Sequence, residues 1–360
     1  MSIGGGVYGQ GLHGRTIDVV PQIDESKRKR KSKKDRDTML SGILSASRSP
    51  AWIAYVLEPS SPSGEQKLKK KRMTSMEMDS LVSSIATDPD FRTMVAKEMR
   101  DTTTFVEELK MNERVLRAYG KDATAFTTLR VVSLLGKQLA GIKVPSTSLH
   151  YTLQSRCQIP LDRFRFKEAS QVRSFVRDVR ASFDRLHKAR FLHADVKRDN
   201  MIFCSSSKGR KYRLIDWGAS ASVDAIRKGY LGGTYVRPKN SISPLAWFAY
   251  GAEPVAQWIT LGRAALLHTR AFTYPEFRQF ASDALTIAND KIDKLVEETG
   301  EDAGTSVEQP KARALAIDRH WKSFDLFNLG FIFAEIAYTT RGGRKERARL
   351  MRLAYKMVSM

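Results

Sequence analysis

Residues 193–200 of the chain read HADVKRDN, and residues 212–218 read YRLIDWG. Just before them, apolar side chains recur every three or four residues over residues 170–188, which predicts an amphipathic α-helix. Residues 201–204 and 212–215 predict two short strands joined by a turn rich in Ser, Gly and Lys. The sequence therefore places polar functional side chains at both ends of a short hairpin that follows a helix.

The order of residue types in these stretches resembles the catalytic loop and the metal-binding triplet of protein kinases. Phosphoryl transfer needs a carboxylate facing the attacking hydroxyl, amide and carboxylate oxygens on Mg²⁺, and a cation against the γ-phosphate. The resemblance gives these roles to Asp195, to Asn200 with Asp216, and to Lys197, and it implies ATP and Mg²⁺ as cofactors. Gly218 is expected to permit a sharp turn where a side chain would clash. A lone Asp or Asn in a basic loop is usually solvated, so the combined pattern carries this interpretation.

Further landmarks of the family follow in order. Residues 232–234 (GGT) and 243–245 (SPL) resemble the end of an activation segment, with Ser-Pro-Leu in place of Ala-Pro-Glu. Residues 321–330 resemble the start of the large central helix of the C-lobe, whose Asp, here Asp325, ties down the backbone of the catalytic loop. Together these features look most like the divergent serine/threonine protein kinases encoded by large nucleocytoplasmic DNA viruses.

The resemblance, which covers residues 170–250 and 320–338, implies an α+β chain with a bilobal protein-kinase-like fold. A small sheet-containing N-lobe with long insertions is expected to precede a mostly helical C-lobe. Ser, Lys, Pro and Gly are abundant early in the chain, which predicts much loop or disorder there. The expected regions are an N-lobe over 1–155, with basic, partly disordered insertions at about 21–90, and a C-lobe over 156–360, with an inserted helical region at about 251–319.

The N-terminal glycines offer a candidate phosphate loop. Gly4, Gly6 and Gly9 fit the pattern G-x-G-x-x-G, whose backbone N–H groups would lie over ATP phosphates. A flexible N-terminal tail is the alternative for the same residues. Further along, residues 103–119 have near-helical apolar spacing, and residues 129–135 are short and β-branched enough for a buried strand.

A lysine that anchors the phosphates is also expected in the N-lobe. Residues 94–97 (MVAK) resemble the family's V-A-x-K strand, which makes Lys97 the candidate and Glu113 its partner, with Glu108 as a nearer rival. A solvated surface lysine is the plain alternative. If residues 51–57 (AWIAYVL) are that strand instead, Tyr55 stands where the lysine should be, and catalysis would be in question.

Ala194 occupies the position where the family usually has an arginine. That arginine pairs with a phosphorylated activation-loop residue, so its absence suggests an activity that this switch does not gate. The hydroxyl-bearing residues of the segment are possible phosphosites, but ordinary loop hydroxyls are the simpler interpretation: Ser220, Ser222, Tyr230, Thr234 and Tyr235.

The charge is strongly positive, with 61 Lys and Arg against 39 Asp and Glu, a net charge of +22. Eight basic residues lie within 27–36, and five lie within Lys67–Arg72. A basic protein favours acidic substrates, and Lys27–Lys34 with Lys67–Arg72 are candidate nucleic-acid contacts, although such runs are more often solvated loops or localisation signals. The tail at residues 341–356 (RGGRKERARLMRLAYK) is expected to form one helix with an exposed cationic face.

The remaining features exclude several classes of protein. No stretch is long and apolar enough for a membrane helix, and the N-terminus does not resemble a secretion signal, so an intracellular protein is expected. Cys157 and Cys204 are the only cysteines, and both are expected to be buried reduced thiols. Three functions stay open: a protein kinase acting on Ser or Thr, a small-molecule phosphotransferase of the aminoglycoside-kinase type, and a degenerate kinase fold kept as a nucleic-acid-binding, virion or scaffold protein.

Overall fold

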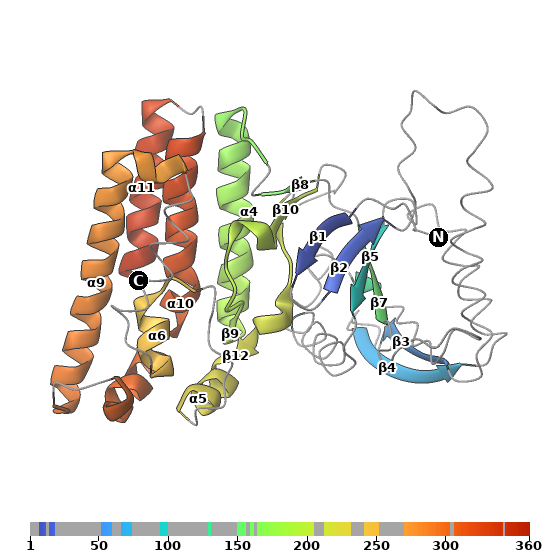
Figure 1. Ribbon diagram of the computed structural model, residues 1–360, viewed down its shortest axis with the longest axis horizontal. Coiled ribbons are helices and arrows are strands. Elements are labelled where there is room, and N and C mark those ends of the chain that lie inside the picture. The colour runs from blue at the N-terminus through green and yellow to red at the C-terminus, as the bar shows by residue number, and fades with distance from the viewer. Residues whose placement is uncertain are drawn as a thin grey trace. The chain divides into compact units, whose positions relative to one another are not determined.

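The chain forms two compact units in the computed structural model, Met1–Cys157 and Gln158–Met360 (Figure 1). The boundary expected from the sequence lay between residues 155 and 156. Both helices and antiparallel strands are present, so the chain is α+β. The structure describes residues 7–11, 14–18, 52–59, 66–73, 94–99, 115, 129–130, 150–155, 159–161, 164–204, 212–231, 241–251, 270–302, 306–340 and 343–360.

A five-stranded antiparallel sheet organises the first unit, in the order β1-β2-β5-β7-β6. The strands β1 and β2 form a hairpin, and β5 lies at the centre, hydrogen-bonded to β2 on one side and to β7 on the other. The sheet therefore combines a meander of β1, β2 and β5 with a return through β6 and β7. Its strands are β1 (Val7–Gly11), β2 (Gly14–Asp18), β5 (Met94–Met99), β6 (Leu129–Arg130) and β7 (His150–Ser155).

A separate two-stranded ribbon is formed by β3 (Trp52–Pro59) and β4 (Gln66–Met73). These strands pair with each other in register, with Tyr55 opposite Lys70, and neither joins the five-stranded sheet. Part of the insertion at about 21–90, which was expected to be partly disordered, thus forms strands, and β3 covers most of the alternative strand at residues 51–57. Its first strand reads WIAYVLEP, and such aromatic and β-branched residues favour extended backbone.

Other expectations for the first unit fall mostly outside the described residues. Of the helix expected at 103–119, only Val115 is described, and it is helical and buried. Of the strand expected at 129–135, the structure describes Leu129–Arg130, which form β6.

The second unit begins with the elements that the periodicity predicted. The helix α4 (Ala169–Lys188) buries its apolar stripe, which confirms the expected helix within one residue. The expected hairpin is β10 (Met201–Phe203) paired with β11 (Tyr212–Leu214), and β10 also pairs with the short β8 (Ile159–Pro160). A second small pair joins β9 (Phe191–Leu192) to β12 (Ala221–Ser222).

Helices make up the rest of the unit: α5 (Val223–Leu231), α6 (Pro244–Tyr250), α9 (Pro275–Thr299), α10 (Pro310–Thr339) and α11 (Arg344–Ser359). The central helix α10 is buried along most of its length and packs against α6, α9 and α11 (Figure 1). It begins at Pro310, eleven residues before the start expected at Trp321, because Pro at the first turn initiates a helix. The α9 helix lies in the region where an inserted helical segment was expected.

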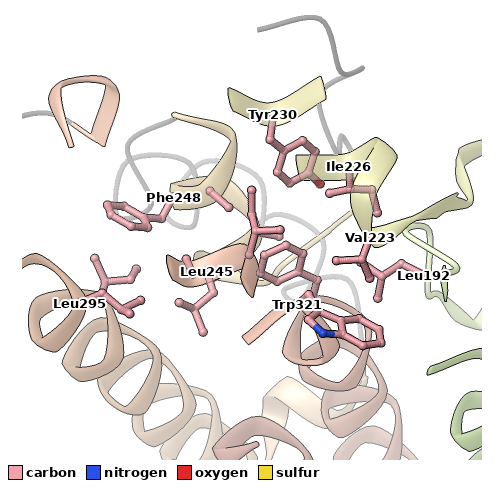
Figure 2. Packing of buried hydrophobic residues seen from close by; sticks show 14 of the residues in the cluster. Leu192, Val223, Ile226, Tyr230, Leu245, Phe248, Leu295 and Trp321 are labelled. Carbon is pink, nitrogen blue, oxygen red and sulfur yellow. The ribbon is translucent and has the colours of Figure 1, made fainter. Parts of the chain in front are cut away.

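A hydrophobic cluster joins these helices to the segment that follows the hairpin (Figure 2). Leu192 of β9, Ile226 of α5, Leu245 of α6 and Trp321 of α10 all belong to it. Burial of this apolar surface fixes α5 and α6 against the central helix. None of the helices described is long and apolar enough to cross a membrane.

Candidate functional site

The loop at residues 193–200 is attached to the central helix through one buried carboxylate. Asp325 of α10 is fully buried, and it accepts the backbone N–H of His193 at 2.8 Å and that of Ala194 at 2.9 Å. Its Oδ2 also lies 3.4 Å from Nε2 of His187 at the end of α4. The tie from Asp325 to the loop backbone, expected from the resemblance, is therefore present.

The His193 side chain links this loop to the end of the hairpin. Its Nδ1 accepts the backbone N–H of Asp195, so Nε2 carries the hydrogen and donates to the Ile215 carbonyl at 3.0 Å. Its ring packs on Trp217, with the ring centroids 4.7 Å apart, and both side chains are buried. His193 thus holds the Asp195 backbone against the residues that precede Asp216.

Asp195 lies at the centre of the polar cluster. Its Oδ2 accepts Nζ of Lys197 at 2.9 Å and Nδ2 of Asn200 at 2.8 Å, and Asn200 also donates to its backbone carbonyl. Its Oδ1 is buried and has no hydrogen-bond partner. A buried carboxylate oxygen without a donor is costly, so this atom is suited to accept a hydrogen bond from a ligand.

Strand pairing places the residue before Asp216 next to Asn200. The residue before it, Ile215, donates its N–H to the Asn200 carbonyl at 2.9 Å, which continues the β10–β11 register into the loops. Asp216 is exposed and has left-handed backbone angles, φ 63° and ψ 70°. Non-glycine residues rarely adopt this conformation, and it is concentrated at functional sites.

The expectation for Gly218 was wrong. A Cβ built on this residue would lie 3.7 Å from Asp216 Oδ1, which is ordinary contact, and its φ is not in the left-handed region. The unusual backbone conformation falls on Asp216 itself, two residues earlier.

One residue of the loop was missed by sequence reasoning. Arg198 donates Nη1 to Glu335 of α10 and Nη2 to the Leu161 carbonyl at 2.7 Å. Its ion pair with Glu335 is largely shielded from solvent, with both side chains about 15% exposed or less. Arg198 thus ties the C-terminal half of the loop to α10, as Asp325 ties the N-terminal half. No sequence signal pairs residues so far apart.

Asn200 and Asp216 carry side-chain oxygen atoms of the kind that Mg²⁺ binds. The described residues contain no group of three or more His, Cys, Asp or Glu side chains placed to hold a metal ion. Mg²⁺ is often held by one or two protein groups together with phosphates, and it prefers oxygen ligands. Asn200 uses Nδ2 for both bonds to Asp195, and no described donor contacts its Oδ1, so this amide oxygen is available as a ligand for such an ion.

The expected glycine loop does not coincide with the turn of the first hairpin. Gly4 and Gly6 lie outside the described residues, and Gly9 lies within β1, paired with Thr16 of β2. A phosphate loop needs a turn between strands, and this hairpin closes instead with Gly11 opposite Gly14. A second stretch, residues 9–14 (GQGLHG), also fits G-x-G-x-x-G and shares Gly9 with the first. It was missed, because nothing in the sequence alone favours one of the two matches over the other.

The two candidates for the anchoring lysine position lie in different sheets. Lys97 is on the central strand β5, opposite Thr16 of β2 and Thr152 of β7. Tyr55 is on β3, which pairs only with β4 among the described strands. Glu113, the expected partner of Lys97, lies outside the described residues, as does Glu108.

The segment from Asp216 to Leu245, whose last part resembles the end of an activation segment, contains the helix α5, which begins at Val223. Ser220 is buried and donates its hydroxyl to the His193 carbonyl, and Tyr230 is buried in the hydrophobic cluster. Two of the possible phosphosites are therefore inaccessible in this conformation. Thr234 and Tyr235 lie outside the described residues, and Ser222 is half-buried.

Arg313 of α10 binds the backbone at the ends of α5 and α6. Its side chain is buried and donates to the backbone carbonyls of Tyr230 at 2.8 Å and Ala249 at 3.2 Å. Burial lowers the pKa of its guanidinium. Ser243, which begins the SPL motif, caps the N-terminus of α6 by accepting the Ala246 N–H.

Cys204 is buried as expected, but the expectation of a reduced thiol was wrong. Cys204 is disulfide-bonded, and the chain has one other cysteine, Cys157. The pairing of Phe203 with Ile159 brings Cys204 to the start of β8, two residues after Cys157 in sequence. Strand pairing between distant segments, which composition does not reveal, accounts for the error.

Of the basic runs, Lys27–Lys34 lies outside the described residues, and Lys67–Arg72 forms most of β4 in the ribbon.

No protein-family model matches the chain, and no curated protein matches it.

Proposed function

We propose that the chain is a Mg-ATP-dependent protein kinase that transfers the γ-phosphate to Ser or Thr hydroxyls. The observation that carries the proposal is the Asp195 carboxylate, whose Oδ2 is held by Lys197 and Asn200 while its buried Oδ1 has no partner. The hydrogen bonds from Lys197 and Asn200 to Oδ2 fix the orientation of the carboxylate, and therefore of Oδ1. A group that accepts the hydrogen of a substrate hydroxyl needs such a fixed orientation. The loop that carries it is fixed at both ends to α10.

Each side chain has a distinct task in this proposal. Asp195 Oδ1 accepts the hydrogen of the acceptor hydroxyl and orients its oxygen for attack, and it takes the proton as the phosphoryl group is transferred. Lys197, about a third exposed, offsets the charge of Asp195 and of the transferred group. Asn200 and Asp216 would hold Mg²⁺, which supplies neutralisation of the phosphate charge when bound.

The N-terminal unit supplies the nucleotide contacts in this proposal. Lys97 is preferred over Tyr55 because β5 directly follows the β1–β2 hairpin in the sheet, as the strand of the anchoring lysine should. Gly9, Gly11 and Gly14 form a second G-x-G-x-x-G pattern beside the expected Gly4, Gly6 and Gly9, and Gly11 and Gly14 pair at the closed end of this hairpin. Their backbone N–H groups are the phosphate donors that such a turn provides. Glu113 stays the candidate partner of Lys97.

The proposal also covers how the activity is regulated and which substrates are preferred. With Ala194 in the loop and Ser220 and Tyr230 buried, activity should not require phosphorylation of the segment. The net charge of +22 favours acidic protein substrates. The Lys at position 197 favours Ser or Thr over Tyr by family resemblance.

The test is transfer of labelled γ-phosphate from Mg-ATP to acidic, basic and Tyr-containing proteins and to aminoglycosides. Asp195→Asn keeps the shape of the side chain and removes the base, so we expect transfer to fall by about 10²- to 10⁴-fold. The matched control is Asp224→Asn, because the Asp224 side chain on α5 is 87% exposed. Lys97→Met should weaken transfer, whereas Lys69→Met on the ribbon should not.

The outcomes separate the candidate functions. Transfer to proteins that Asp195→Asn abolishes and Asp224→Asn preserves would support the kinase. Transfer to aminoglycosides alone would indicate a small-molecule phosphotransferase. A chain that binds no Mg-ATP and transfers nothing would be a kinase fold kept for binding.

A further inference from the structure

The last helix of the chain has two opposite faces. Its apolar side chains are buried under α10: Leu350, Ala354, Met357 and Val358. The basic side chains Lys345, Arg349, Arg352 and Lys356 are all exposed. They are spaced i, i+4, i+7 and i+11, which places them on one face of the helix. At 1.5 Å per residue this cationic row is about 16 Å long.

Few acidic groups neutralise the cationic row. The one acid of α11 is Glu346, which lies 3.6 Å from Arg349 and 3.8 Å from Arg173 of α4. Among the residues that the structure describes, no acidic side chain forms an ion pair with Lys345, Arg352 or Lys356. Like charges three and four residues apart destabilise a helix, so the row is unfavourable unless an anion meets it.

The geometry limits which anion fits. Most of the apolar face of α11 is covered by α10, and Met351 and Leu353 are half-buried, so the helix lacks the wide exposed apolar face that interfacial helices insert into a membrane. A straight row of cations about 16 Å long matches a polymer with charges at regular intervals, and nucleic-acid strands carry a phosphate at every step. Arg and Lys are the side chains that commonly bind phosphate.

We propose that the cationic row of α11 (Lys345, Arg349, Arg352 and Lys356) binds the phosphate backbone of nucleic acid. Arg173 extends the surface onto α4, since Glu346 brings it next to Arg349. Contact is made to phosphates and not to bases, so binding is independent of sequence and strongly dependent on salt. This inference does not rest on the proposed kinase activity.

The test compares binding of the full-length chain to a short labelled DNA duplex over a range of salt concentrations. The variant is the triple substitution Lys345→Gln, Arg352→Gln and Lys356→Gln, which keeps helix-forming side chains and removes three charges. We expect the slope of log K against log salt to become shallower by about 2 to 3, and the affinity at low salt to fall at least about tenfold.

The matched control removes the same charge elsewhere, through Lys188→Gln, Lys294→Gln and Lys311→Gln on the exposed surfaces of α4, α9 and α10. This control should leave the slope near that of the native chain. Asp195→Asn should bind DNA as the native chain does, so that failure of the kinase proposal and failure of this one can be told apart.

Several results would overturn the inference. These are an absence of duplex binding at low salt, an equal loss in the two triple variants, or a loss only when the five basic residues of β4 are replaced. Binding to vesicles containing phosphatidylserine, but not to DNA, would assign the cationic row to membranes instead.

Discussion

Replacing Asp325 by Asn tests how the loop at residues 193–200 is held. The native carboxylate accepts two backbone N–H groups of the loop, from His193 and Ala194, and it is fully buried. An asparagine side chain offers one oxygen acceptor and places an NH₂ donor against the second N–H. One charge-assisted hydrogen bond is therefore lost, the other becomes neutral, and one buried donor is left without an acceptor.

The expected cost can be worked from these contacts. A hydrogen bond to a charged group contributes about 1.5 to 3 kcal/mol, and an unsatisfied buried donor costs about 1 to 3 kcal/mol. Since the two overlap, we expect the free energy of unfolding to fall by about 3 kcal/mol. Urea denaturation followed by tryptophan fluorescence measures this quantity, because four of the five tryptophans lie in the second unit.

The same substitution on the solvent face of α10 is the control. Asp318 is 45% exposed and pairs with the half-exposed Arg227, so Asp318→Asn should cost less than about 1 kcal/mol. If Asp325→Asn costs no more than Asp318→Asn, then Asp325 does not anchor the loop, and the positioning argument for Asp195 fails with it. Phosphoryl transfer should fall in Asp325→Asn, even under conditions where the variant is fully folded.

Three further substitutions test the packing and electrostatics of the second unit. Gly330→Ala would place a Cβ 2.8 Å from a methyl group of α11, so overpacking should cost about 1 to 3 kcal/mol in urea denaturation, whereas Gly343→Ala, with nothing within 4 Å, should change little. Arg313→Met leaves two backbone carbonyls without donors and should cost about 2 kcal/mol; an unchanged denaturation midpoint would refute the anchoring role. Burial and the hydrogen bond to Asp283 raise the pKa of Tyr355 to about 12, so the stability they give is present below the ordinary tyrosine pKa and is lost as the pH rises from about 10 through 12. Asp283→Asn should lower the Tyr355 pKa in a spectrophotometric titration; a pKa that stays near 12 would show that burial alone raises it.

The elements next to the site were predictable because local patterns determine them. Helix α4 and the β10–β11 hairpin follow from apolar spacing, and both formed within a residue or so of the expected bounds. The Asp325 contact was predictable only through resemblance, since no local pattern relates it to residues more than a hundred positions away.

Other features depend on pairing between distant segments. The pattern ending at Gly9 and the pattern at residues 9–14 are equivalent as sequence, and the pairing of β1 with β2 distinguishes them. Arg198 reads as one more solvated cation until α10 brings Glu335 to it. The helix α5 was missed because the resemblance assigned its residues to a loop, although Val223, Ile226 and Tyr230 recur at near-helical intervals and are buried.

The strained backbone of the site explains why it needs such anchors. Three described non-glycine residues have positive φ, namely Arg190 at 53°, Ala194 at 60° and Asp216 at 63°, and all flank the candidate site. Each such residue costs free energy and persists only where its surroundings hold it. Ala194 is held by the Asp325 carboxylate, and Asp216 follows a residue bound to the Asn200 carbonyl. The buried carboxylate of α10 therefore holds Ala194, next to Asp195, in a left-handed conformation that glycine would adopt at a lower cost in stability.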